Sequence, residues 1–361
     1  MIYYFIADLI HHFSIFNVCR YITFRSICAV FTALLVSFIF GKKFISFLKS
    51  VQTAGQPIRE DGPDSHIMTK AGTPTMGGAL ILFSTIVSTF IWADLQNKYV
   101  WICLSAMLAY GMIGFIDDYR KLKYKNSKGL SAKAKFSMQL LFGLLVSILI
   151  GSVAESSATT LFFPFFKNVG VDLGLFYFVF SSIVITGSSN AVNLTDGLDG
   201  LAIMPIIIAA ACFALISYLT GNIVFANYLQ LNYVQSAGEI AVLCASLIGA
   251  GLGFLWYNAP PAKVFMGDIG SLSLGALLGS ISVITKHEIV LGIICGLFVI
   301  EAMSVILQVA SFKLYGRRIF KMAPIHHHFE KLGWSESTIV MRFWIVAIIF
   351  ALIGLSTLKL R

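Results

Sequence analysis

The sequence predicts an all-α polytopic membrane protein, and two observations support that prediction. Of the 361 residues, 58% are hydrophobic and only 12% are charged, with a mean hydropathy of +0.85. Soluble domains carry about 25% charged residues. Apolar runs close to the roughly 20 residues that cross a bilayer recur along the whole chain. We therefore expect a single integral-membrane domain over residues 1–361.

The apolar runs predict about ten transmembrane helices. Residues 1–20 contain Asp8, His11 and His12, which is not the pattern of a removable signal peptide, and we expect an interfacial lead-in there. The windows are 21–40, 76–93, 100–116, 136–153, 173–189, 201–219, 240–256, 269–285, 289–310 and 339–358. Because their number is even, both ends of the chain should lie on one side of the membrane.

The distribution of cations predicts the orientation. Loops after the odd-numbered spans hold 19 of the 26 Lys and Arg residues, and the opposite side, both ends included, holds 7. Cytoplasmic loops carry the excess of such residues. We therefore expect both termini outside the cytoplasm. The six cysteines occur singly inside apolar runs, which is typical of small core residues rather than of disulfides or a zinc site.

Two adjacent carboxylates stand at the end of the third span. Asp117 and Asp118 follow an apolar run and precede seven cations that extend to Lys135. Mg²⁺ prefers hard oxygen ligands and usually shares them with substrate phosphates, so this pattern suits a metal and a pyrophosphate. A helix that ends at the headgroups with a solvated charged loop is the plainer alternative.

A polar cluster follows the fifth span. Asn190 and Asn193 precede Asp196 and Asp199, and two glycines within this stretch predict a tight loop. Short amide and carboxylate side chains on such a loop can meet a sugar, a base or a metal. A turn whose side chains bond only to their own backbone remains the alternative.

A third cluster leads into the eighth span. Gly267, Gly270 and Ser271 allow close approach of the backbone at an expected helix N-terminus, which favours phosphate. Asp268 would repel a bare phosphate, so its position suggests a metal between the two. Its alternative role is an ordinary N-cap.

The remaining polar signals lie in two loops and one span. The loop 56–78 contains Lys70 and Thr75, and the loop 312–338 contains three consecutive histidines at 326–328. On a helix the three rings point in different directions, so at most one or two could enter one site; solvated interfacial histidines are the alternative. Glu301 and Gln308 lie on one face of the ninth span, where polar groups usually face a cavity or a partner.

Taken together, these motifs resemble one family, the polyprenyl-phosphate N-acetylhexosamine-1-phosphate transferases. The resemblance covers nearly the whole chain, including the ten-span layout. The histidine triplet favours the branch that uses a muramoyl-pentapeptide donor. The segments that carry the resemblance are Lys70 with 73–78, then 114–119, 190–200, 264–271 and 324–330.

The resemblance implies a Mg²⁺-dependent phosphotransferase of the bacterial inner membrane, with its active site facing the cytoplasm. Such an enzyme transfers phospho-MurNAc-pentapeptide from UDP-MurNAc-pentapeptide to undecaprenyl phosphate, which gives lipid I and UMP in the first membrane step of peptidoglycan synthesis. It further implies a homodimer in contact with membrane lipid, and no nucleic acid partner.

The resemblance also implies roles for individual residues. Asp268 is the leading Mg²⁺ ligand, with Asp117 and Asp118 near the metal, and His327 completes the catalytic set. Asp117 is our choice for the base that deprotonates the acceptor phosphate, and a covalent phosphoryl-enzyme through Asp268 is the rival mechanism. The implied substrate-binding residues are Lys70, Thr75, Lys121, Lys125, Lys133, Asn190, Asn193, Asp196, Gly197, Asp199, Asn258, Phe265, Gln308, His326 and His328.

Two other functions fit parts of the pattern. A sibling transferase would use UDP-GlcNAc or a related UDP-amino sugar and would differ only in its donor. A secondary transporter would also combine intramembrane polar residues with glycine-interrupted spans, but its key groups should lie near the middle of the bilayer. Here the predicted site residues gather at one face.

Overall fold

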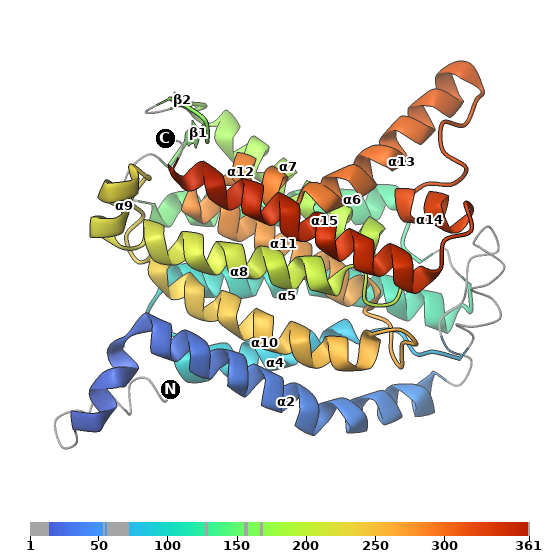
Figure 1. Ribbon diagram of the computed structural model, residues 1–361, viewed down its shortest axis with the longest axis horizontal. Helices are drawn as coiled ribbons and strands as arrows, with labels where there is room; N and C mark the ends of the chain where they lie inside the picture. The colour runs from blue at the N-terminus through green and yellow to red at the C-terminus, as the bar shows by residue number, and fades with distance from the viewer. Residues whose placement is uncertain are drawn as a thin grey trace.

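A computed structural model describes residues 14–52, 55, 72–126, 129–154, 158–166 and 169–359, and its helices form one elongated bundle (Figure 1). The elements are η1 (Ser14–Arg20), α2 (Ile22–Val51), α4 (Gly78–Trp92), α5 (Lys98–Lys123), α6 (Ala132–Val153), β1 (Thr160–Phe162), β2 (Gly170–Asp172), α7 (Phe176–Thr195), α8 (Ile203–Thr220), α9 (Ile223–Leu229), η2 (Ala237–Glu239), α10 (Ile240–Asn258), α11 (Gly267–Thr285), α12 (Glu288–Ile294), α13 (Gly296–Tyr315), α14 (Ile325–Glu330), α15 (Glu336–Ser356) and η3 (Thr357–Lys359).

The helical membrane architecture is confirmed. Within the described residues, eight helices are long and apolar enough to cross a bilayer, and each falls on a predicted window. The helix α4 coincides with the second window but is shorter, and α7, on the fifth window, falls outside that set of eight. Figure 1 shows α2 beginning and α15 ending at the same end of the bundle. The count of ten spans and the orientation in the membrane stay predictions.

The structure differs from the predicted windows in two places. The ninth window is divided into α12 and α13 at Cys295, whose backbone is not helical (φ −87°, ψ 24°). The loop after α6 contains an antiparallel pair of strands, with Thr160 opposite Asp172, so the fold is not purely helical. The exposed Phe165 and Phe166 lie between these strands.

The helix α11 forms the centre of the bundle and positions the site. Its apolar window is 94% buried, and it packs against α5 and α7 (Figure 1). Small residues on its surface let neighbouring helices approach closely, as is common between membrane helices. One such close approach lies at Gly114 of α5, where an added Cβ would be 2.2 Å from the carbonyl oxygen of Asp268.

A buried polar network fastens the end of the bundle where α11 ends, far from Asp268 at the start of that helix. The Lys286 ammonium, just after α11, donates to the Ala158 carbonyl at 2.6 Å and to the Tyr177 hydroxyl at 2.9 Å. Tyr177 in turn donates to the Glu288 carboxylate. Burial lowers the pKa of Lys286 to about 8, although the Glu288 carboxylate opposes that shift. Lys286 therefore ties the segment before β1 to α7 and α12.

Candidate active site

Three carboxylates from two helices converge at one end of the bundle. Asp117 and Asp118 lie in the last two turns of α5, and Asp268 lies in the first turn of α11. One oxygen from each lies within 4.8 Å of the others. Asp117 and Asp118 are only 3% and 1% exposed, so the alternative of a solvated helix end is wrong.

Two lysines neutralise most of this charge. The Lys121 ammonium lies 2.6 Å from Asp117 Oδ2, 3.2 Å from Asp268 Oδ2 and 3.5 Å from Asp118 Oδ1. From α6, the Lys135 ammonium lies 2.6 Å from the same Asp268 Oδ2. Three carboxylates within a few ångströms repel one another strongly, and ammonium groups between them reduce that repulsion.

Backbone and amide groups hold each carboxylate in place. Asp117 Oδ1 accepts a hydrogen bond from the Leu130 amide at 2.7 Å. Asp118 Oδ2 accepts one from the Ile269 amide at 3.4 Å, so Asp118, not Asp268, bonds to the first turn of α11. Asp268 Oδ1 accepts from the Asn193 side chain at 2.9 Å. The predicted alternative of Asp268 as an N-cap is therefore wrong, and its carboxylate faces the lysines.

Two of the predicted motifs meet beside this cluster. The amide of Phe265 donates to the Pro74 carbonyl, and the amide of Gly77 donates back to the Phe265 carbonyl. This pairing brings Thr75 to Gly267, whose φ of +71° suits glycine. A Cβ at Gly267 would lie 2.5 Å from Asp118 Oδ2 and 2.6 Å from Thr75 Oγ1.

The donor set fits a divalent cation. Buried Asp118 Oδ1 accepts no hydrogen bond, and the Thr75 hydroxyl is also buried without a hydrogen-bond partner in the part of the chain that the structure describes. Carboxylate oxygens are hard ligands of the kind that Mg²⁺ and other divalent cations take. The cluster can therefore hold one such ion and place it against an anionic ligand.

Comparison with known proteins identifies the family. Residues 100–286 match the sequence model of glycosyl transferase family 4, and residues 70–82 match signature 1 of phospho-N-acetylmuramoyl-pentapeptide-transferase. Proteins named phospho-N-acetylmuramoyl-pentapeptide-transferase from Rickettsia prowazekii (strain Madrid E) and Granulibacter bethesdensis (strain ATCC BAA-1260 / CGDNIH1) are each 59% identical over 362 aligned residues, covering 100% of both chains. The chain belongs to the phospho-N-acetylmuramoyl-pentapeptide-transferase family. The resemblance drawn from the motifs is thereby confirmed.

In this family member, the loop after α7 is tied to two neighbouring segments. The Asp199 amide donates to Glu336 at the start of α15, and Asp199 Oδ2 accepts from the Ala262 amide at 2.9 Å. Asn258 Oδ1 accepts from the Gly200 amide at 3.1 Å. Asp199 and Asn258 therefore shape the loop that carries Asp196. Asn190, one turn before Asn193 on α7, bonds to Gln139 of α6 at 2.8 Å.

The three histidines of α14 face three different partners. His326 is fully buried and pairs through Nδ1 with Glu301 of α13 at 3.0 Å. Its other ring nitrogen faces Gly197, where an added Cβ would be only 2.3 Å away. His327 pairs with Glu330 at 2.5 Å, and His328 accepts a hydrogen bond from the Lys321 amide. His326 therefore contacts the loop after α7.

Gln308 holds the chain between α13 and α14. Its side-chain oxygen accepts from the amides of Ile319 and Phe320, and its nitrogen donates to the Phe320 carbonyl. Together with the pair of Glu301 and His326, these bonds explain the two polar groups on one face of α13. Both residues therefore fasten the loop that carries the histidines.

Some of the lysines predicted for the site do not lie at the carboxylates. Lys125 and Lys133 are exposed and form no ion pair with the three carboxylates, and Lys70 lies outside the described residues. Lys135 was missed. Its signal was a cation in the first turn of α6, where the helix dipole disfavours positive charge unless an acidic partner compensates. Gln52, which bonds to both backbone groups of Thr75, had no such signal.

Proposed function

We propose that the carboxylate–lysine cluster of Asp117, Asp118, Asp268, Lys121 and Lys135 is where this chain carries out its family's reaction. As a member of that family, the chain is a phospho-N-acetylmuramoyl-pentapeptide transferase, which makes lipid I. The convergence of α5 and α11 at three carboxylates carries the proposal, because it places a cation site beside two fixed ammonium groups. Two negatively charged substrates can meet only where charge of this kind is neutralised.

The proposed reaction joins two phosphates. An oxygen of undecaprenyl phosphate attacks the phosphorus attached to the MurNAc sugar of UDP-MurNAc-pentapeptide. A P–O bond forms there, the P–O bond to UMP breaks, and UMP leaves with the bonding electrons. Asp268, Asp117 and Asp118 would hold Mg²⁺. When bound, the ion would neutralise charge on the pyrophosphate.

The chain's own residues would divide the remaining work. Lys121 and Lys135 would hold the negative charge that builds up between the two phosphates. Asp117 would take the proton of the acceptor phosphate, and its bond to Leu130 fixes its orientation. In the rival mechanism Asp268 would itself become phosphorylated. Its two oxygens already bond to Asn193, Lys121 and Lys135, an arrangement that supports a ligand role more than a nucleophile.

The proposed donor pocket extends from the cluster toward α14. The uridine side would draw on Lys70, Asn193, Asp196, Gly197, Asp199 and Phe265. Lys125 and Lys133 would attract the phosphates from solvent. Thr75, Asn190, Asn258, Gln308, His326 and His328 would complete or support the pocket, with His327 near the reacting phosphates. Contact of Gly197 with His326 supports this assignment, because it joins the loop after α7 to α14.

The reaction is tested with purified protein, Mg²⁺ and undecaprenyl phosphate, to which each UDP-sugar is added in turn. We expect UMP release from UDP-MurNAc-pentapeptide and none above background from UDP-GlcNAc, and chelation of the metal should stop it. UMP release from UDP-GlcNAc alone would assign the sibling reaction. Release from neither donor would favour a transporter.

Lys135 gives a sharper test of the cluster. Lys135→Gln removes a charge-assisted contact worth about 1.5–3 kcal/mol, so we expect UMP release to fall about tenfold to a hundredfold. Lys133→Gln is the matched control, because Lys133 precedes it by two residues on α6 but is exposed. Its loss should stay below about threefold. An equal loss in both variants would mean that only the overall charge of this helix end matters.

Orientation and assembly complete the proposal. We place the cluster on the cytoplasmic side of the bacterial inner membrane, in line with the cation distribution along the chain. The proposed assembly is a homodimer, as the resemblance implies.

A further inference from the structure

The second half of α13 does not pack against the bundle. Its buried residues end at Ser304, and none of residues 305–315, all of which the structure describes, is buried. This half is nevertheless apolar: Ile306, Leu307 and Phe312 are 58%, 45% and 57% exposed. Figure 1 shows α13 projecting away from the other helices. An apolar helix face of this kind needs lipid or another apolar partner around it.

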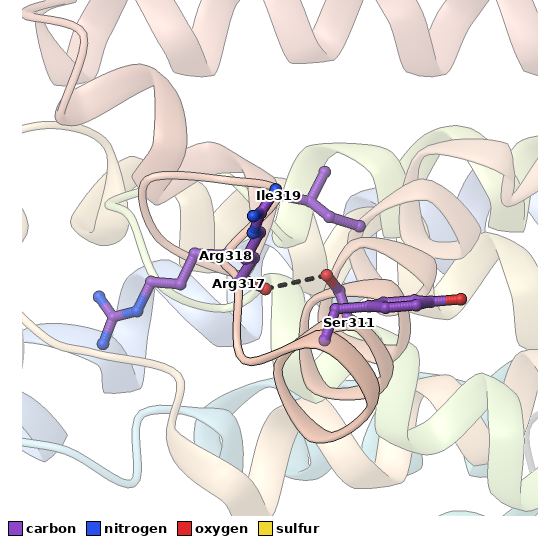
Figure 2. A pocket seen from close by; sticks show the side chains of 5 residues that line it. Ser311, Arg317, Arg318 and Ile319 are labelled. Carbon is purple, nitrogen blue, oxygen red and sulfur yellow. Dashed lines mark hydrogen bonds between the residues drawn. The ribbon is translucent and has the colours of Figure 1, made fainter.

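A cavity lies where this helix ends. The chain turns at Gly316, whose φ is +65°, and the Ser311 hydroxyl donates to the Arg317 carbonyl at 2.9 Å. That hydrogen bond, drawn in Figure 2, folds the following residues back beside the helix end. The cavity has a volume of about 460 Å³ and is lined by Ser311, Tyr315, Arg317, Arg318 and Ile319.

The stretch of chain that forms this cavity carries charge of one sign only. Lys313, Arg317, Arg318 and Lys321 lie within residues 302–329, a stretch that contains no Asp or Glu. Neither guanidinium group of the two arginines bonds to another group in the described part of the chain, and both side chains are exposed. Guanidinium groups bind phosphate through paired hydrogen bonds. The cavity therefore fits an anion that contains phosphate.

We infer that this cavity binds the headgroup of an anionic phospholipid, whose acyl chains lie along the exposed face of α13. The apolar face and the two arginines are adjacent, which matches a molecule with a charged head and an apolar tail better than a soluble phosphate. The site is separate from the carboxylate–lysine cluster, because none of its five lining residues belongs to that cluster. The inference does not depend on the proposed reaction.

The test uses the full chain in nanodiscs of phosphatidylcholine. A small share of the lipid is photoreactive phosphatidylglycerol or, in parallel, photoreactive phosphatidylcholine, with the reactive group on the acyl chain. Chymotryptic peptides are then quantified, because cleavage at aromatic residues does not change when arginine is replaced. We expect phosphatidylglycerol to label the α13 segment about fivefold or more above phosphatidylcholine.

The variant Arg317→Gln/Arg318→Gln should remove that preference, since each cation near an anionic lipid strengthens its attraction. Lys42→Gln/Lys43→Gln is the matched control, because it also removes two adjacent exposed cations, on α2. The control should keep the preference. Both arginines are exposed, so the variant should melt like the unaltered protein, and UMP release should persist.

Four results would overturn the inference. Equal labelling by the two lipids would remove headgroup recognition, and an unchanged preference in the arginine variant would remove these residues from the site. Displacement by millimolar inorganic phosphate would make the ligand a free anion. Displacement by undecaprenyl phosphate at a concentration equal to that of phosphatidylglycerol would assign the cavity to the acceptor lipid instead.

Discussion

Replacement of Asp268 by Asn is expected to lower UMP release at least about 10³-fold, since preorganised charge at a reacting phosphate contributes on that scale. The change removes one charge and almost no volume. It takes away the proposed metal ligand and the partner of Lys121 and Lys135. The hydrogen bond from Asn193 can still form, because an amide oxygen also accepts. The variant should therefore fold, with a melting temperature within a few degrees of the unaltered protein.

Asp172→Asn is the control for that substitution. Asp172 lies on β2 at the other end of the bundle and is exposed. Hydrogen bonds from Thr159 and Gly174 lower the pKa of its carboxyl group, so it contributes to the hairpin. The variant Asp172→Asn should release UMP at the normal rate. Activity of the Asp268 variant within about tenfold of normal would contradict a role at the reacting phosphates.

Replacement of Gly114 by Ala should damage both the fold and the site. The new Cβ would lie 2.2 Å from the Asp268 carbonyl oxygen and 2.5 Å from the Ile269 nitrogen. Both atoms belong to the backbone, so α5 and α11 would have to separate, and overpacking of this kind costs about 1–3 kcal/mol or more. Separation would also pull Asp117 and Asp118 away from Asp268. We expect a lower melting temperature and a loss of UMP release greater than about 10²-fold.

Gly111→Ala is the matched control, one turn earlier on the same helix. Its Cβ would meet the end of the Leu82 side chain at 2.8 Å and other groups only beyond 3.5 Å. A flexible side chain can move aside, so stability and activity should change little. If the two glycine variants behaved alike, the close crossing at Gly114 would not be what positions the carboxylates.

Much of the fold followed from apolar windows alone. Membrane helices are long and apolar on most faces, so their existence can be read from composition along the chain. Their ends cannot be read in this way. The helix α5 continues through two carboxylates to Lys123, because Lys121, one turn later, pairs with both, and Asp118 also accepts from the Ile269 amide of α11. The division of the ninth span at Cys295 depends on how α12 and α13 pack, which local propensity does not specify.

The sequence predicted the three carboxylates of the candidate site, but it predicted only one of the two lysines that pair with them. Carboxylates near a membrane are few, so Asp117, Asp118 and Asp268 stood out. The cations of the site did not stand out in the same way. Seven cations lie between Asp118 and the end of the first turn of α6, and each of them could have faced the carboxylates. Only the rotation of α6 about its axis places Lys135 on Asp268 and leaves Lys133 exposed. Rotation of this kind follows from tertiary packing.

Mn²⁺ binding shows whether the carboxylates from α5 and α11 form one cation site. Free Mn²⁺ is measured by electron paramagnetic resonance in the presence of the unaltered protein, of Asp118→Asn and of Asp268→Asn. Substitution of a residue that only supports a metal ligand weakens metal binding about 10- to 100-fold. We expect Asp118→Asn and Asp268→Asn each to weaken Mn²⁺ binding by more than that. The variant with both substitutions should bind Mn²⁺ only slightly more weakly than either single variant. Normal Mn²⁺ binding by Asp268→Asn would mean that the two helices do not share an ion, and the proposed cation site would be wrong.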